Sequence, residues 1–349
     1  KTHMHNDGAQ ALRIIQNVNT PHLDLLVREA IQNSLDAGRF KNDVYVDFSI
    51  KEFYPEKLNN NFEHINHTLN SKYGNNKQKL IVISDKNTEG LTGGFDYSVD
   101  KLGNLLKLVY NIGKPQDQKG AGGSWGYGKT IYYRLGIGIV IYYSRIKTSD
   151  NNYEERLVAS LVEDQNAKET IIKYENDNKT GIAWFGALNE EGHSIPVTDE
   201  NIINEVLSSI NIERYKNDET GTRIIIPYID EYKLMAEANS YVLENEVALY
   251  DDIVEYLTFA IQKWYAPRLN NDQYIYGKQN NLIVSVNNEI ITDDDFHELF
   301  LIIREMYKTS FTNNFKKLNE LAPNSEFFIE KINVNLGADN KYLSNVNIG

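Results

Sequence analysis

The segment from Leu23 to Gly38, LDLLVREAIQNSLDAG, constrains the fold of this chain more than any other. Three polar residues, Glu29, Asn33 and Asp36, stand at i, i+4 and i+7 and therefore fall within about 60° of one another on a helix. The apolar residues recur at helical spacing on a different face: Leu23, Leu26, Val27, Ala30, Ile31 and Leu35. The pattern predicts a helix that buries one side and presents a carboxylate, an amide and a second carboxylate on another.

Length and charge limit the classes of protein to consider. The chain has 349 residues, of which 41% are apolar, enough for one large core or two domains. Its formal charge of −13 argues against a broad nucleic-acid-binding surface, although a local basic groove could still bind DNA. It contains no cysteine, and it shows no secretory signal or membrane-spanning run. We therefore expect a cytoplasmic protein that does not contact membranes.

The first part of the chain alternates between strand and helix patterns. Residues 52–78 are polar and Asn-rich, and we expect them to form a loop. Helices are predicted over residues 98–112, 130–135 and 200–210. Strands are predicted over residues 44–50, 79–84, 137–143, 156–163, 170–174, 181–185 and 222–229.

The composition changes near Asp230. Helical patterns continue to Trp264, and two strands follow over residues 282–286 and 289–291, joined by an Asn-Asn turn. A further helix and strand are predicted over residues 293–307 and 326–336. These patterns predict a first domain over residues 1–230 and a smaller α/β domain over 231–349. The final residues carry no stop signal after a strand-like run, so we expect the chain to be a piece of a longer protein.

Four signals in the first domain carry chemistry. The first is the polar row, the residues Glu29, Asn33 and Asp36 on the predicted helix from Leu23 to Gly38. The second is Asp85, which ends an apolar strand and is followed by Gly90. The third is the glycine-rich segment GAGGSWGYGKT over residues 120–130, and the fourth is the pair Gly221-Thr222 at the start of a strand.

The glycine-rich segment fits two phosphate-binding patterns. One is G-x-x-G-x-G, and the other is the P-loop pattern G-x-x-x-x-G-K-[ST]. Both direct backbone N–H groups toward phosphates, but a P-loop follows a buried strand, whereas the residues here follow a polar stretch. A P-loop would also leave the polar row of the helix unexplained. The candidate nucleotide-binding residues of the glycine-rich segment are Gly123, Ser124, Trp125, Gly126, Tyr127, Gly128, Lys129 and Thr130.

In this order, the four signals resemble the motifs of the GHKL ATPases, which include DNA gyrase, heat-shock chaperone ATPases, histidine kinases and MutL. The stretch QNSLDAG is most similar to the MutL and topoisomerase form, and the resemblance covers about residues 10–230. It implies an α/β fold of the family type, a two-layer sandwich known as the Bergerat ATP-binding fold, with helices on one face of a mixed sheet. The following domain would resemble a transducer domain. ATP and Mg²⁺ are the implied cofactors.

The resemblance also implies roles for single residues. Glu29 would be the catalytic base that orients water, Asn33 would ligate Mg²⁺, and Asp36 would lie beside the nucleotide. Asp85 would accept a hydrogen bond from the adenine amino group, and Thr222 would support Asp85 through a water. The glycines of the segment would wrap the phosphates, with residues 88–128 as a mobile lid.

The sequence departs from the family pattern at two places. After Asp85 the usual first glycine is replaced by Asn87, which tolerates left-handed backbone geometry, and Gly90 is displaced by one residue. Lys129 is not general in the family, and we expect it to contact a phosphate as a point charge. A cation from the second domain is also expected at the γ-phosphate, with Lys263, Arg268 and Lys278 as candidates.

The resemblance also implies an ATP-gated dimeric clamp. We expect a homodimer that forms on ATP binding and acts in DNA processing or in genome (antiviral) defence with a nuclease or helicase partner. The acidic net charge is more compatible with a chaperone-like ATPase that remodels proteins. A protein that binds ATP without hydrolysing it is a third hypothesis.

Overall fold

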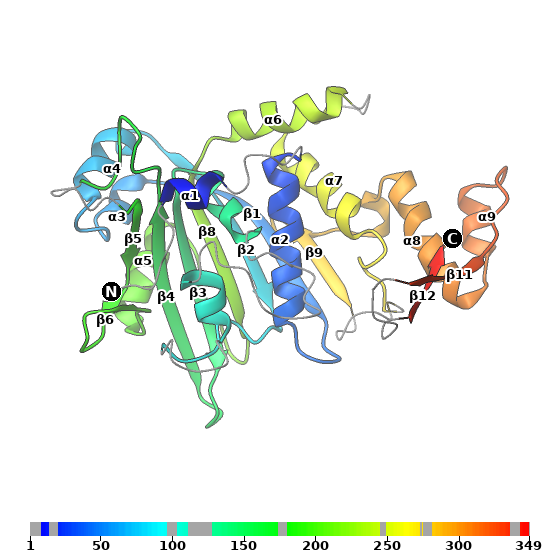
Figure 1. Ribbon diagram of the computed structural model, residues 1–349, viewed down its shortest axis with the longest axis horizontal. Coiled ribbons are helices and arrows are strands. Elements are labelled where there is room, and N and C mark those ends of the chain that lie inside the picture. Colours follow the sequence, from blue (N-terminus) through cyan, green and yellow to red (C-terminus); the bar gives the residue numbers. More distant parts are fainter. Residues whose placement is uncertain are drawn as a thin grey trace.

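The chain is built around one large mixed sheet (Figure 1). The computed structural model describes residues 8–13, 20–95, 103–110, 128–173, 180–244, 249–272, 274, 281–335 and 343–348. The eight strands of this sheet follow the order β10-β9-β1-β2-β8-β3-β4-β5. Neighbours are antiparallel except β1 and β9, which are parallel. The strands are β1 (Val44–Phe53), β2 (Gln78–Lys86), β3 (Ile139–Lys147), β4 (Tyr153–Val162), β5 (Ile182–Phe185), β8 (Gly221–Ile229), β9 (Leu282–Val286) and β10 (Glu289–Ile290).

One face of the sheet is covered by the helix predicted from the polar row and by later helices. The helix α2 (His22–Ala37) crosses this face, with α6 (Glu231–Glu244) and α7 (Ile253–Tyr265) beside it (Figure 1). Its apolar stripe is buried against Val46 and Ile83 of the sheet and Leu257 of α7, in one hydrophobic cluster. The fold class, a mixed α/β sandwich, is confirmed. Three short elements complete this side: α1 (Gly8–Arg13), the π-helix η1 (Leu106–Tyr110) and the 3-10 helix η2 (Gly128–Arg134).

The opposite face carries a second, smaller cover of helices. Residues 52–78, predicted as a loop, continue β1 and then form α3 (Pro55–Asn59) and α4 (Asn66–Tyr73), so that prediction is wrong. Leu58, Phe62 and Leu69 are buried there among residues of α5 (Glu200–Ser209) and the sheet. Their burial stabilises two helices that are too short and too polar to be recognised from periodicity.

The strand predicted over residues 170–174 is wrong for its described part, residues 170–173, which form a bend. The carboxylate of Glu163 accepts hydrogen bonds from the backbone N–H groups of Ile171 and Ile172, at 2.6 and 3.1 Å. These N–H groups are therefore satisfied by a side chain and not by a strand partner. A two-stranded sheet of β6 (Ala187–Leu188) and β7 (Ser194–Ile195) follows later in the chain.

The last part of the chain combines helices with a second small sheet. It contains the 3-10 helix η3 (Asp293–Asp295), α8 (Glu298–Thr312), α9 (Lys316–Leu321) and the antiparallel pair β11 (Glu330–Asn335) and β12 (Leu343–Ile348). The strands β9 and β10 lie beyond residue 230 yet belong to the main sheet. The division of the chain at residue 230 stays a prediction. No helix among the described residues has the length and apolar character that a bilayer crossing requires.

Candidate functional site

The polar row lies on the half-buried side of α2. Glu29 and Asn33 are partly buried, and Asp36 is exposed, where its carboxylate accepts a hydrogen bond from Gln32 at 2.9 Å. The side chain of Glu29 is 20% exposed, and its burial raises the pKa of the carboxyl group. The Arg28 guanidinium, 3.4 Å from the Glu29 carboxylate, lowers this pKa in part, and the charge of Asp36 raises it. A raised pKa favours proton transfer near neutral pH.

Asp85 lies near the end of β2 and is 8% exposed. Its Oδ1 accepts hydrogen bonds from the Thr88 hydroxyl and, at 2.9 Å, from the backbone N–H of Thr222 on β8. Its Oδ2 lies 3.2 Å from the hydroxyl of Ser34, which is also 3.0 Å from the carbonyl oxygen of Ala30. The Ser34 hydroxyl has one proton and can donate it fully to only one of these two oxygens. Oδ2 can therefore accept a further hydrogen bond.

Burial dominates the electrostatics of Asp85. It raises the pKa of the carboxyl group to about 6, although the bonds from Thr88, Thr222 and Ser34 oppose this shift. At pH 7 about nine-tenths of such a group is ionised. A ligand that donates a hydrogen bond to Oδ2 therefore meets a buried, largely charged acceptor, which makes that bond strong and selective.

Two glycines bring the chain close to Asp85. A Cβ on Gly221 would lie 2.1 Å from the backbone oxygen of Asp85, so only glycine can stand at position 221 without moving the two strands apart. Gly90 has a φ of +69°, and a Cβ there would lie 2.6 Å from the Ser144 hydroxyl. Asn87 takes a φ of +63°, so the left-handed geometry predicted at this position is confirmed.

The turn after Asp85 is attached to the end of α2. The backbone N–H of Glu89 donates to the carbonyl oxygen of Ala37 at 2.8 Å, and Gly38 pairs with Thr88 in an isolated β-bridge. Together with Ser34, these contacts place the C-terminal half of α2 directly against the turn that follows β2. Asn33, one residue before Ser34, therefore belongs to the same local site as Asp85.

Tyr132, which the sequence analysis did not select, lies among these residues. It belongs to η2, is fully buried, and its hydroxyl accepts a hydrogen bond from Asn33 Nδ2 at 3.0 Å. Burial raises the pKa of its phenol, the hydrogen bond with Asn33 lowers it in part, and the charges of Glu29 and Asp85 raise it. The segment Ile131-Tyr132-Tyr133 reads as an ordinary apolar run, and nothing local distinguishes this tyrosine.

Most of the glycine-rich segment lies outside the described residues. This applies to Gly123, Ser124, Trp125, Gly126 and Tyr127. The backbone of Gly128 and Lys129 starts η2, and Thr130 is buried in it.

The cations expected from the second domain have other partners where they are described. Lys263 Nζ lies 2.7 Å from Asp24 at the start of α2. Arg268 is buried, donates to the backbone oxygen of Asn271 at 3.3 Å and stacks over Tyr274. Lys278 lies outside the described residues. A residue beyond position 230 that does approach the row is Tyr265. Its hydroxyl donates to the backbone oxygen of Arg28 at 2.6 Å, and its pKa is raised by burial and by Glu29.

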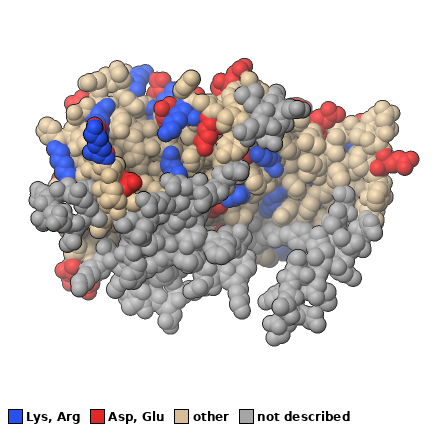
Figure 2. Space-filling model, turned by 45° about the horizontal axis from the view of Figure 1, so that its top comes forward, with Lys and Arg blue, Asp and Glu red and all other residues tan. Residues whose placement is uncertain are grey.

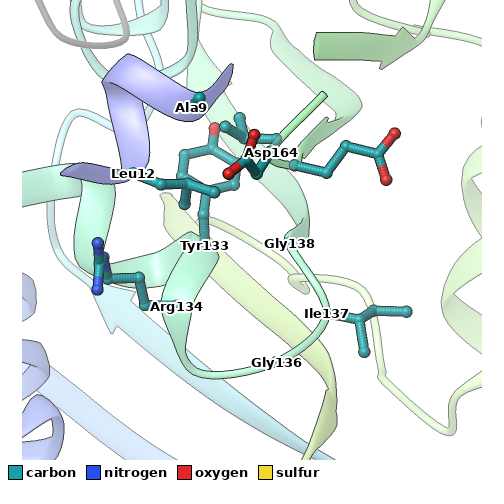
Figure 3. Close-up of a pocket in the computed structure, with 10 residues that line it drawn as sticks. Ala9, Leu12, Tyr133, Arg134, Gly136, Ile137, Gly138 and Asp164 are labelled. Carbon is teal, nitrogen blue, oxygen red and sulfur yellow. The ribbon is translucent and has the colours of Figure 1, made fainter. Parts of the chain in front are cut away.

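A cavity lies next to η2 but does not include the site. It has a volume of about 380 Å³ and lies between α1, which carries Ala9 and Leu12, and the turn from Gly136 to Gly138 (Figure 3). Tyr133 and Arg134 line it, whereas neither the polar row of α2 nor Asp85 does. The hydrogen-bonding geometry around Asp85 and Asn33, not this cavity, defines the candidate site.

Metal ligands are sparse in the described part of the chain. No group of three or more His, Cys, Asp or Glu side chains is placed there to hold an ion. Asn33 offers its Oδ1, which accepts no hydrogen bond from another described residue, and Glu29 lies four residues earlier on the same helix. Such a set fits Mg²⁺, which takes one or two protein ligands and completes its shell with water and substrate phosphates.

Comparisons with known proteins identify no family for the chain. No protein-family model matches it, and no curated protein does. One similar solved structure is the ATPase region of Saccharomyces cerevisiae topoisomerase II bound to ICRF-187 (dexrazoxane), with a TM-score of 0.37 and 10% sequence identity. The match covers 90% of this chain, which spans about half (55%) of that solved chain. A likeness this remote carries no argument about activity.

Proposed function

We propose that this protein binds ATP together with Mg²⁺ and hydrolyses it to ADP and phosphate. The observation that carries the proposal is the approach of Ser34 on α2 to the buried carboxylate of Asp85, since it joins the polar row and the candidate base-recognition residue in one site. The order of the four sequence signals supports it.

Asp85 selects the base. Its Oδ1 accepts hydrogen bonds from Thr88 and from the backbone of Thr222. Its Oδ2 accepts a hydrogen bond from the exocyclic amino group of adenine. Guanine and hypoxanthine carry a carbonyl oxygen at the same position, and two acceptors would then face each other in a buried site.

The residues of the polar row act at the phosphates. Asn33 holds Mg²⁺ through Oδ1, and the ion supplies charge neutralisation at the phosphate oxygens. Glu29 orients the attacking water and accepts its proton, for which its raised pKa suits it. Asp36 lies beside the nucleotide at the exposed end of the row. We also propose that the glycine-rich segment wraps the phosphates and that Lys129 contacts one of them.

Two substitutions on α2 test the proposal. Glu29→Gln keeps the shape but cannot take a proton, so we expect Mg·ATP binding to persist while turnover falls by about a hundredfold or more. Asn33→Ala removes the metal ligand, so we expect Mg²⁺-dependent ATP binding to be lost. Binding is measured by calorimetry, and turnover by phosphate release. Glu205→Gln, an exposed position on α5, is the matched control and should change neither.

The outcomes separate the hypotheses. Normal turnover by Glu29→Gln would reject the site assignment. Binding by the unmodified protein without any turnover identifies an ATP sensor, and absence of ATP binding rejects the whole proposal.

The biological setting is proposed from the sequence resemblance. We propose an ATP-promoted homodimer that acts on DNA with a nuclease or helicase partner. Figure 2 shows one face, on which Lys and Arg side chains of the described residues are interspersed with Asp and Glu. We expect DNA to raise the ATPase rate, an effect that weakens steeply with added salt. If DNA of every form leaves the ATPase rate unchanged, a chaperone-like ATPase is favoured. If Glu29→Gln stays monomeric when ATP is added, the dimeric clamp is contradicted.

A further inference from the structure

Tyr132 is hydrogen-bonded to Asn33, the residue assigned to the metal. Its side chain is fully buried on η2, and its hydroxyl oxygen lies 3.0 Å from Nδ2 of Asn33. Through this bond Tyr132 contacts the proposed metal ligand directly. Neither the proposed chemistry nor the sequence motifs give this residue a role.

An asparagine amide has two ends of opposite character. Only Oδ1 can ligate a cation, whereas Nδ2 donates hydrogen bonds and repels it. The amide rotates about its terminal bond with broad preferences, so an isolated Asn33 side chain would present either end. A phenol hydroxyl can accept from Nδ2 or donate to Oδ1. In the structure the Tyr132 hydroxyl accepts from Nδ2, and this bond holds the amide with Oδ1 turned to the other side.

We propose that Tyr132 is a positioning residue that holds the amide of Asn33 with Oδ1 available to Mg²⁺, an inference that rests on the proposed function. The phenol oxygen is the acceptor that binds Nδ2.

Removing the single hydroxyl tests this role. In Tyr132→Phe the amide loses its partner, and we expect the Mg²⁺ concentration needed for half-maximal ATP binding to rise about three- to tenfold, the equivalent of one ordinary hydrogen bond. ATP binding in EDTA should not change. Tyr133→Phe is the matched control, because it removes the adjacent buried hydroxyl, which contacts Tyr142 and Ser160 and not Asn33. The readout is calorimetric ATP binding across a Mg²⁺ titration, with thermal unfolding of each variant.

A double substitution separates positioning from a general structural effect. Asn33→Asp supplies an oxygen at both ends of the side chain, so its orientation no longer matters for the metal. In that background we expect Tyr132→Phe to leave the Mg²⁺ requirement unchanged. An equal shift in both backgrounds, or an equal shift in Tyr133→Phe, contradicts the inference. An unmodified protein whose ATP binding ignores Mg²⁺ contradicts the proposed function instead, whereas a Mg²⁺-dependent protein with an unaltered Tyr132→Phe variant contradicts only the role of Tyr132.

Discussion

Replacing Asp85 with Asn is expected to weaken ATP binding by about a hundredfold or more and to invert the preference between ATP and ITP. The amide oxygen of Asn can still accept from Thr222 N–H and the Thr88 hydroxyl, so the side chain should keep its place. Its Nδ2 then takes the position of Oδ2, next to Ser34. It would face the amino group of adenine donor to donor, but it can donate to the 6-carbonyl oxygen of hypoxanthine. The measurement is calorimetric affinity for both nucleotides.

A second carboxylate on the neighbouring strand provides the control. Asp47 on β1 is also hydrogen-bonded by a hydroxyl and a backbone N–H, from Ser285 at 2.6 Å and Asn288 at 2.8 Å. Asp47→Asn should leave the ATP-to-ITP affinity ratio unchanged. If Asp85→Asn also leaves the ratio unchanged, Asp85 does not read the base.

The pH dependence of the same ratio follows from the pKa of Asp85. Only the ionised carboxylate accepts from the adenine amino group without competition from its own proton. With a pKa of about 6, the ionised fraction falls about tenfold between pH 7 and pH 5, so the ATP-to-ITP ratio should fall by a similar factor. The ratio cancels the titration of the phosphates, which both nucleotides share. In Asp85→Asn the ratio should no longer vary with pH.

Local patterns in the sequence predicted the parts of this site that lie along single elements. The helix periodicity from Leu23 to Gly38 identified α2 to within a residue at each end, and the apolar run before Asp85 identified β2. The Asn87 turn followed from the backbone tolerance of one residue type. Each of these inferences uses only neighbours in the sequence, where spacing determines which side chains share a face.

Contacts between distant elements could not be predicted in this way. The acceptor that Asn33 donates to is 99 residues away on η2, and the N–H that bonds to Asp85 is 137 residues away on β8. Tyr132 has the same local pattern as its buried neighbours, so only the packing of η2 against α2 reveals it. In the same way, the family resemblance made Lys263 one of three candidates for the γ-phosphate, but its ammonium group lies at Asp24.

Asp24 is the centre of a buried polar cluster that fastens α7 to the helix carrying the row. Its side chain is fully buried in the first turn of α2. It accepts hydrogen bonds from the hydroxyl of Tyr256, from Lys263 Nζ at 2.7 Å and from Trp264 Nε1 at 2.9 Å. All three donors come from α7, and Tyr265 from the same helix bonds to the backbone of α2 four residues further on. The orientation of α2 relative to α7 therefore depends on one carboxylate.

Replacing Asp24 with Ala is expected to lower the free energy of unfolding by about 3–5 kcal/mol, the usual cost of removing one partner from a buried charged cluster. The substitution leaves a phenol, an indole and an ammonium group without their common acceptor. Urea unfolding followed by tryptophan fluorescence measures the effect directly, because Trp264 is one of the three donors.

The same helix supplies the control for this prediction. Asp36→Ala removes an exposed carboxylate from the other end of α2 and should change stability by no more than about 0.5 kcal/mol. Asp24→Asn retains one acceptor oxygen and should fall between the two. A stability of Asp24→Ala within 1 kcal/mol of the unmodified protein would show that the three donors of α7 find water or other acceptors, in which case α2 is held by apolar packing alone. If instead the loss is large while the folded fraction of Asp24→Asn still binds ATP, the cluster supports the site without touching the nucleotide.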